Sequence, residues 1–367
     1  MRLRIFSEKN IFRQNNTIGE KRMTHHHDHE CEYSDIQDEL ESTIDALAVR
    51  GKGLLAADES TSTIEKRFTS IGIENTEENR RAYRTLLCST PNLNETICGV
   101  ILFEETLGQK DNQGKYLAQV LADAGIIPGI KVDQGLIDLP NTYGEKVSQG
   151  LDGLQERLLG YKKQGARFAK WRNVYNIAET APTMTAVKAG AEMLARYAAT
   201  CQSVGIVPIV EPEVLMDGDH SIEDCAEVTE MVQHEVFNAL FTHQVVLEYM
   251  ILKPNMVIAG KDCPEQNSPE EVAEYTLSVL RNHVPAAVPT INFLSGGQTP
   301  REAVLNLNAM NAMGEQPWNI SFSYGRALQE ECLKHWAGKA ANVKVAQEAL
   351  LEWARCNSAA ALGQFEA

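Results

Sequence analysis

Residues 247–256, LEYMILKPNM, form a short apolar run that ends in a lysine and is followed by a proline. Its length and apolar content predict a buried strand, and Pro254 marks the point where strand pairing stops. Lys253 is therefore expected at the carboxyl end of a buried strand, with its stem among apolar neighbours. Lysine is rarely buried in this way, because desolvation disfavours the ammonium ion. A neutral amine is a nucleophile, so the segment indicates either a lysine that forms a Schiff base or one whose head reaches water.

Seven more short apolar stretches accompany this one at spacings of roughly 30 to 45 residues. Amphipathic helical patterns lie between them, and two begin with proline at the first helical position, at Ser268-Pro269 and Thr299-Pro300. Eight strands that alternate with helices predict an α/β fold, a (β/α)8 TIM barrel in a single domain with C-terminal helices. An open doubly wound sheet is the alternative. The predicted strands comprise residues 53–60, 99–107, 127–135, 167–175, 206–215, 247–257, 288–297 and 318–325.

Composition narrows the class of protein. A net charge of -16 argues against a nucleic-acid or anionic-membrane partner. No apolar run reaches the roughly 18 residues of a membrane span. The eight cysteines are scattered without a C-x-x-C pair, which is typical of a reduced intracellular protein. We therefore expect a cytoplasmic protein without nucleic-acid or membrane partners.

The start of the chain differs from its acidic body. We predict a flexible N-terminal extension over residues 1–38 and a barrel domain over residues 39–367. Residues 1–22 are basic, and two interpretations stay open: an organelle-targeting leader, or a disordered extension ahead of a start at Met23. Residues 25–31, HHHDHEC, offer metal-ligand side chains but lack the spaced framework of a zinc site, so no metal is assigned.

Charged side chains recur at the predicted strand ends. Reactive groups of a TIM barrel come from the carboxyl ends of its strands, and alternate residues of a strand point the same way. Burying charges of both signs around one centre costs free energy unless the charges pair, and such clusters are typical of functional sites. We therefore favour a shared active site over a structural salt-bridge network. The pairs are Asp58 with Ser60, Lys131 with Asp133, Lys170 with Arg172, Glu211 with Glu213, and Lys253 with Asn255.

The last two predicted strands end in glycine-containing turns, LSGG at 294–297 and SYGR at 323–326. Glycine lets backbone amides approach an anion closely, and a barrel commonly holds a phosphate after its seventh and eighth strands. Arg326 adds a guanidinium fork that suits phosphate oxygens. The alternative for the Ser-Gly-Gly segment is an ordinary strand-to-helix turn.

These residues belong to motifs that resemble class I fructose-bisphosphate aldolase, in unbroken order from about residue 51 to about residue 359. The resemblance implies a lyase of glycolysis and gluconeogenesis that reversibly cleaves fructose 1,6-bisphosphate to dihydroxyacetone phosphate and glyceraldehyde 3-phosphate through a lysine Schiff base. It also implies sugar phosphate ligands, no cofactor and a homotetramer. The motifs are GKG (51–53), AADEST (56–61), FAKWR (168–172), VEPE (210–213), LKPNM (252–256), FLSGGQ (293–298) and FSYGRAL (322–328).

The resemblance also implies a role for each matching residue. Lys253 would form the Schiff base, and Asp58 would take the C4 hydroxyl proton during cleavage. Glu211 would serve carbinolamine dehydration and hydrolysis, and Lys170 would hold substrate and keep the Lys253 amine neutral by like-charge proximity. Arg172 and Glu213 would lie beside Lys170. One phosphate would meet Ser295, Gly296, Gly297, Ser323, Gly325 and Arg326, and the other would lie near Ser60, Thr63, Arg67 and Lys131.

The chain departs from the family pattern at two places. Thr63 stands where many members have serine, and because the hydroxyl is kept we expect a small effect. Family members usually end in a tyrosine that reaches the active site, whereas the last tyrosine here is Tyr324. We therefore expect proton exchange on the enamine to be slower or to use another group.

Two further functions stay open at this stage. A binding or scaffolding protein would be favoured by loss of a central charged residue, yet Asp58, Lys170, Glu211 and Lys253 are all present. A metal-dependent aldolase would use the histidine-rich start, and activity in excess chelator would exclude it. The chemistry itself needs no metal, because a protonated imine accepts the electron pair that the broken C3–C4 bond leaves. Preference among fructose 1,6-bisphosphate, fructose 1-phosphate and sedoheptulose 1,7-bisphosphate stays open.

Overall fold

The computed structural model describes residues 25–366, and side chains from residue 34 onward. The basic leader lies outside the described residues, as do the side chains of the histidine-rich segment. The described residues from Ile36 onward form one compact unit. The first helix, α1, runs from His25 to Leu47, so the predicted boundary at residue 38 falls within a helix. The division into 1–38 and 39–367 stays a prediction.

Eight parallel strands close into a barrel in the order β1-β10-β9-β8-β7-β6-β3-β2, and pairing of β10 with β1 completes the ring. Each strand overlaps one of the predicted stretches, so the (β/α)8 prediction is confirmed and the open sheet is excluded. The barrel strands are β1 (Gly53–Ala57), β2 (Ile97–Leu102), β3 (Ile127–Lys131), β6 (Phe168–Tyr175), β7 (Val207–Val214), β8 (Ile251–Leu252), β9 (Thr290–Phe293) and β10 (Asn319–Tyr324).

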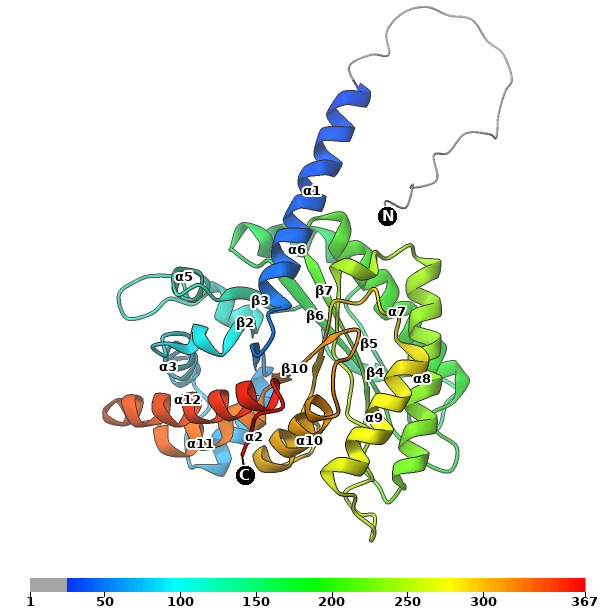
Figure 1. Cartoon of the computed structure of the whole chain (residues 1–367). Helices are drawn as coiled ribbons and strands as arrows, with labels where there is room; N and C mark the ends of the chain where they lie inside the picture. Colours follow the sequence, from blue (N-terminus) through cyan, green and yellow to red (C-terminus); the bar gives the residue numbers. More distant parts are fainter. Residues whose placement is uncertain (1–24, 367) are drawn as a thin grey trace, which may run out of the picture. The chain divides into compact units, whose positions relative to one another are not determined.

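Helices connect the strands and lie outside the barrel, where α7, α8, α9 and α10 follow one another (Figure 1). The two helices predicted to begin with proline do so after Ser268 and Thr299, and each also has a capping box at its start. A hairpin of β4 (Leu136–Asp138) and β5 (Lys146–Ser148) follows β3. The remaining elements are α2 (Thr61–Ser70), α3 (Glu77–Cys88), η1 (Leu93–Glu95), α4 (Glu104–Gly108), α5 (Leu117–Asp123), α6 (Leu154–Lys163), α7 (Met184–Ser203), α8 (Ile222–Thr242), η2 (Leu247–Tyr249), α9 (Pro269–His283), α10 (Pro300–Ala312), α11 (Arg326–Trp336), η3 (Ala340–Asn342) and α12 (Val343–Ala360).

The segment 247–256 is a strand over only two residues. Its first part forms the 3-10 turn η2, in which Glu248 is exposed and its neighbours are half-buried, so the prediction of one continuous buried strand is wrong. Strand pairing starts at Ile251 and ends before Pro254, which has no N–H to donate. The N–H of Lys253 still donates to the Val210 carbonyl at 2.8 Å. The predicted position of Lys253 at the carboxyl end of a buried strand is therefore confirmed.

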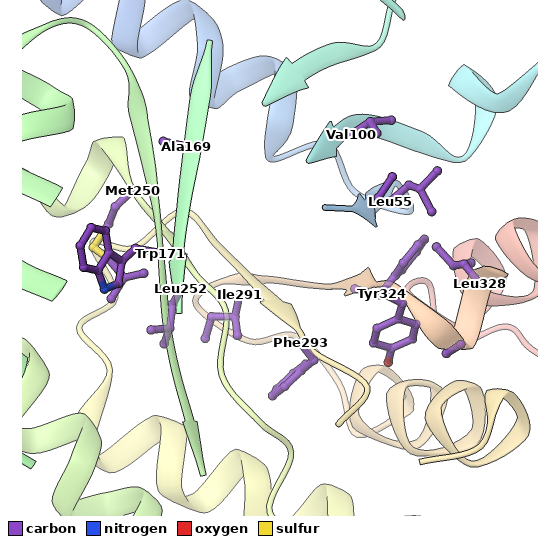
Figure 2. Close-up of a cluster of buried hydrophobic side chains, with 14 of the residues drawn as sticks. Leu55, Val100, Ala169, Trp171, Met250, Leu252, Ile291, Phe293, Tyr324 and Leu328 are labelled. Atoms are coloured by element: carbon purple, nitrogen blue, oxygen red, sulfur yellow. The ribbon is translucent and has the colours of Figure 1, made fainter. Parts of the chain in front are cut away.

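Side chains of the strands alternate between the two faces of the barrel wall. Outward-pointing residues pack with the surrounding helices in one large apolar cluster, which Figure 2 shows. Leu55, Val100, Trp171 and Ile291 are among them. Because each strand is covered outside by helices and filled inside by side chains, the apolar runs in the sequence are nearly continuous.

Apolar side chains fill the barrel toward the amino ends of its strands. Phe168, Ile209 and Ile251 form a second cluster with residues of α1, including Leu40 and Ile44. Gly129 leaves room for the Phe168 ring, since a Cβ at this position would lie 2.2 Å from Phe168 Cε2. Two residues after these three inward-pointing positions of β6, β7 and β8 come the charged side chains of Lys170, Glu211 and Lys253. The charges therefore face a pocket at the carboxyl end, closed below by an apolar layer.

Candidate active site

A pocket of about 700 Å³ lies at the carboxyl ends of the barrel strands. It contains groups from the ends of most strands, as expected for the functional end of this fold. Every residue predicted for the site lines this pocket except Gly297 and Asn255. The lining residues from the prediction are Asp58, Ser60, Thr63, Arg67, Lys131, Lys170, Arg172, Glu211, Glu213, Lys253, Ser295, Gly296, Ser323, Gly325 and Arg326.

Two lysines and two carboxylates form a connected group at the pocket floor. Lys170 Nζ lies 2.8 Å from Asp58 Oδ2 and 3.3 Å from Glu211 Oε2. The other oxygen of the same glutamate, Glu211 Oε1, lies 3.0 Å from Lys253 Nζ. Glu211 thus bridges the two lysines, and each of these buried side chains has an oppositely charged neighbour.

The protonation of this group follows from burial opposed by charge. Burial raises the pKa of Asp58, but the charges of Lys170 and then Lys253 outweigh it and hold that pKa below its usual range. The same balance lowers the pKa of Glu211. Burial lowers the pKa of Lys170, whereas the carboxylates of Asp58 and Glu211 outweigh burial and raise it. At neutral pH the pocket floor therefore contains two ionised carboxylates and a charged Lys170.

Two further ion pairs stand beside this group on β3, β6 and β7. Lys131 Nζ lies 2.7 Å from Asp133 Oδ1 and donates to the carbonyl of the same residue at 2.8 Å. Arg172 pairs with Glu213. The predicted alternation of charged residues thus holds on these strands, because residues two apart point to the same side.

Asn255 is the exception among the predicted pairs. Its Oδ1 accepts from the Val214 N–H at 3.0 Å, and its Nδ2 donates to Thr229 Oγ1 at 3.2 Å. Thr229 belongs to α8, so Asn255 points out of the barrel and the prediction that it faces the pocket is wrong. The alternation fails because Pro254 ends the strand between Lys253 and Asn255.

The turns after β9 and β10 are joined by Arg326. Its Nη2 donates to the carbonyls of Gly297 at 2.7 Å and Gln298 at 2.9 Å. Gly296 has a positive φ of 52°, which favours glycine. A Cβ at Gly297 would lie 2.1 Å from Met216 Sδ, so Gly297 is needed for packing behind the turn. Its predicted contact with a phosphate stays a prediction.

Hydroxyl groups at the start of α2 also line the pocket. Ser60 is the N-cap, and its Oγ lies 3.1 Å from Thr63 Oγ1. Arg67, from the last turn of the same helix, pairs with Glu59. A helix N-terminus with hydroxyl groups and a nearby guanidinium is suited to an anion.

Glu59 is a pocket residue that the sequence analysis missed. It pairs with Arg67 and with the buried Arg84, and it accepts from Gln329 Nε2 at 2.9 Å. Burial raises its pKa, but the charges of Arg67 and Arg84 outweigh burial and lower it. In the sequence Glu59 stands between two predicted pocket residues, Asp58 and Ser60. The two-residue period of a strand places it on the opposite face from Asp58, so it was not predicted to line the pocket.

Among the residues described, no three His, Cys, Asp or Glu side chains lie close enough to hold a metal ion. Within the same part of the chain, every helix is too short or too polar to cross a lipid bilayer.

Comparison with known proteins places this geometry in a family. The family model for fructose-bisphosphate aldolase class-I matches residues 39–367. A probable fructose-bisphosphate aldolase class 1 of Xanthomonas campestris is 54% identical over 330 residues, which cover 90% of this chain and 99% of that protein. The cytosolic fructose-bisphosphate aldolase 5 of Arabidopsis thaliana is 54% identical over 89% of this chain and 92% of its own length.

A solved structure agrees with the sequence relatives. The Plasmodium falciparum fructose-bisphosphate aldolase, in a complex with TRAP and a small molecule inhibitor, superposes with a TM-score of 0.90. It is 51% identical, and the match covers 91% of this chain and 96% of that chain. The motif resemblance is therefore confirmed along nearly the whole barrel. The chain belongs to the class I fructose-bisphosphate aldolase family of glycolytic carbon–carbon lyases.

Proposed function

We propose that Lys253 is the residue through which this aldolase binds its substrate covalently. The observation that carries the proposal is the buried contact of Glu211 with both Lys253 and Lys170. Glu211 Oε1 lies 3.0 Å from Lys253 Nζ, so it can take a proton from this lysine, and the resulting amine then attacks a ketone. Attack at C2 of fructose 1,6-bisphosphate gives a carbinolamine, and loss of water gives a protonated imine.

The two carboxylates would then divide the proton transfers. Glu211, 3.0 Å from Lys253 Nζ, is placed to protonate the departing carbinolamine hydroxyl and to accept a proton in the reverse step. Asp58 would take the C4 hydroxyl proton. The C3–C4 bond then breaks, its electron pair moves into the imine, and glyceraldehyde 3-phosphate leaves. Protonation of the enamine at C3 and hydrolysis of the imine release dihydroxyacetone phosphate.

Two sets of cationic and hydroxyl groups in the pocket would bind the two phosphates. We assign one phosphate to the turns after β9 and β10, where Ser323 Oγ is buried without a hydrogen-bond partner among the described residues. Arg326 would supply charge there. The other phosphate would meet the start of α2 together with Arg67 and Lys131. The remaining members of these two groups are Ser60, Thr63, Ser295, Gly296, Gly297 and Gly325.

The direct test is reduction with borohydride in the presence of dihydroxyacetone phosphate, followed by peptide mapping. We expect one stable adduct on Lys253 and none in Lys253→Met. The matched control is Lys131→Met, which keeps the proposed nucleophile and should keep the adduct. An adduct on Lys170 or Lys131 in the parent protein would overturn the assignment.

No metal ion or cofactor enters this scheme, because the protonated imine is the electron sink. Cleavage of fructose 1,6-bisphosphate should therefore continue in excess chelator. An activity that chelator abolishes and a divalent ion restores would point to metal-dependent chemistry.

Location and assembly are proposed on the resemblance and the composition. We propose a cytoplasmic protein, supported by its scattered cysteines and its acidic charge. We also propose a homotetramer, as the family resemblance implies. Light scattering after size exclusion would check the assembly, and imaging of the full-length chain would check the compartment.

A further inference from the structure

Asp133 is a buried pocket carboxylate to which the reaction scheme assigns no role. It follows β3, lines the pocket and is 9% exposed. Its Oδ1 is engaged, because it contacts Lys131 Nζ at 2.7 Å and accepts from the Gly135 N–H at 3.2 Å. Its Oδ2 is buried and has no hydrogen-bond partner within the described residues. A buried acceptor without a donor costs free energy, so a group that supplies a donor there would bind favourably.

The surroundings of Asp133 indicate what kind of donor fits. The negative charge of Asp133 contributes to the raised pKa values of Lys170 and Arg172, so it is close to the reacting group as well as to Lys131. An ionised carboxylate only accepts hydrogen bonds, and it repels a phosphate. The group at Asp133 Oδ2 must therefore donate a hydrogen bond and carry no negative charge. A hydroxyl of the substrate between the cleaved bond and the phosphate near Lys131 has both properties.

The hydroxyl groups of fructose 1,6-bisphosphate leave one candidate on that half of the molecule. C2 carries the ketone that Lys253 attacks, and Asp58 accepts the proton of the C4 hydroxyl. The C5 hydroxyl lies between C4 and the second phosphate and has no assigned acceptor. In the condensation direction the same group is the C2 hydroxyl of glyceraldehyde 3-phosphate.

We propose that Asp133 is a specificity-determining residue whose Oδ2 accepts a hydrogen bond from the C5 hydroxyl of the substrate. The inference rests on the proposed function, which places the aldehyde half of the substrate beside Lys131. Asp133 thereby selects aldehydes that carry a hydroxyl next to the carbonyl. A site that hydrogen-bonds a substrate hydroxyl discriminates strongly against an analogue without it, because its own buried group then stays unpaired.

The test compares kcat/KM for condensation of dihydroxyacetone phosphate with glyceraldehyde 3-phosphate and with 3-oxopropyl phosphate, which lacks the C2 hydroxyl but is otherwise the same aldehyde. The parent protein should prefer the hydroxylated substrate by about 10- to 100-fold, the range for a hydrogen bond to a charged group. In Asp133→Ala the preference should fall to about twofold or less. Lys131→Met is the matched control: it should lower kcat/KM for both substrates by a similar factor and keep the preference.

Two outcomes would overturn the inference. One is a parent protein that condenses both aldehydes equally well, a result that needs no variant and therefore no assumption about folding. The other is an Asp133→Ala variant that keeps the parental preference. Loss of the preference in Lys131→Met as well would show that Asp133 acts only by holding Lys131, which also contradicts direct hydroxyl binding.

The borohydride adduct separates this inference from the proposed function. Dihydroxyacetone phosphate lacks the aldehyde half, so Asp133→Ala should form the Lys253 adduct as the parent does. Adduct formation without a change of preference would reject the inference alone. Absence of a Lys253 adduct in the parent would reject the proposed function itself.

Discussion

Glu59→Gln is expected to lower the free energy of unfolding by about 3–5 kcal/mol, the cost of removing one partner of a buried ion pair. The side chain of Glu59 is 5% exposed and that of Arg84 is 3% exposed, so neither charge can turn to water. Glutamine keeps the size and one acceptor oxygen. It removes the negative charge, and the Arg84 guanidinium is then buried without its anion.

The matched control is Glu105→Gln. Glu105 pairs with Arg80 through two hydrogen bonds of 2.6 and 2.7 Å, but the two side chains are 27% and 14% exposed. Water can reach this pair, but two hydrogen bonds are lost, so we expect a smaller change of about 1 kcal/mol, the upper end for an exposed pair. Urea denaturation of the three proteins at pH 7, followed by circular dichroism, measures both differences in the free energy of unfolding.

The pH dependence of the Glu59→Gln effect has a definite sign. The folded pKa of Glu59 lies below its ordinary value of 4.5, so its stabilising contribution is complete above that value. The contribution is lost as the pH falls through the lower folded pKa. The difference between parent and variant should therefore be constant from pH 6 to 8 and narrow below about pH 4.5. A Glu59→Gln variant within 1 kcal/mol of the parent, or a difference that does not narrow in acid, would refute this reasoning.

Two other substitutions probe the barrel interior and the chemistry. Gly129→Ala should destabilise the protein by about 1–3 kcal/mol, because the added Cβ would lie 2.2 Å from the Phe168 ring. The control is Gly160→Ala in α6, where no atom lies within 4 Å of the added Cβ. In thermal unfolding this control should be neutral or stabilising by about 1 kcal/mol. Equal melting temperatures for the two variants would contradict the packing argument. Asp58→Asn should lower kcat for cleavage about 10²- to 10⁴-fold while the Lys253 adduct with dihydroxyacetone phosphate persists, and an unchanged kcat would remove Asp58 from its role.

The sequence alone predicted the barrel and the strand-end positions of its charged residues. Both depend on local signals: apolar runs that mark strands, capping residues that start helices, and the two-residue period that points Glu211 and Glu213 the same way. The same local reasoning failed at Asn255, where a proline interrupts the period, and at residues 247–249, where an apolar run lies partly at the surface.

Only the tertiary structure decided which charges pair. Lys170 contacts Asp58 from β1 and Glu211 from β7, and Glu59 pairs with Arg84 from α3; none of these partners is a sequence neighbour. The sequence offered several acids for each base and no means to choose among them. Closure of the barrel makes the choice, because pairing of β10 with β1 sets the distance between groups that begin far apart in the chain. The two-residue alternation of side chains is a property of a single strand and follows from the local sequence. A distance across the barrel depends on the arrangement of all eight strands together.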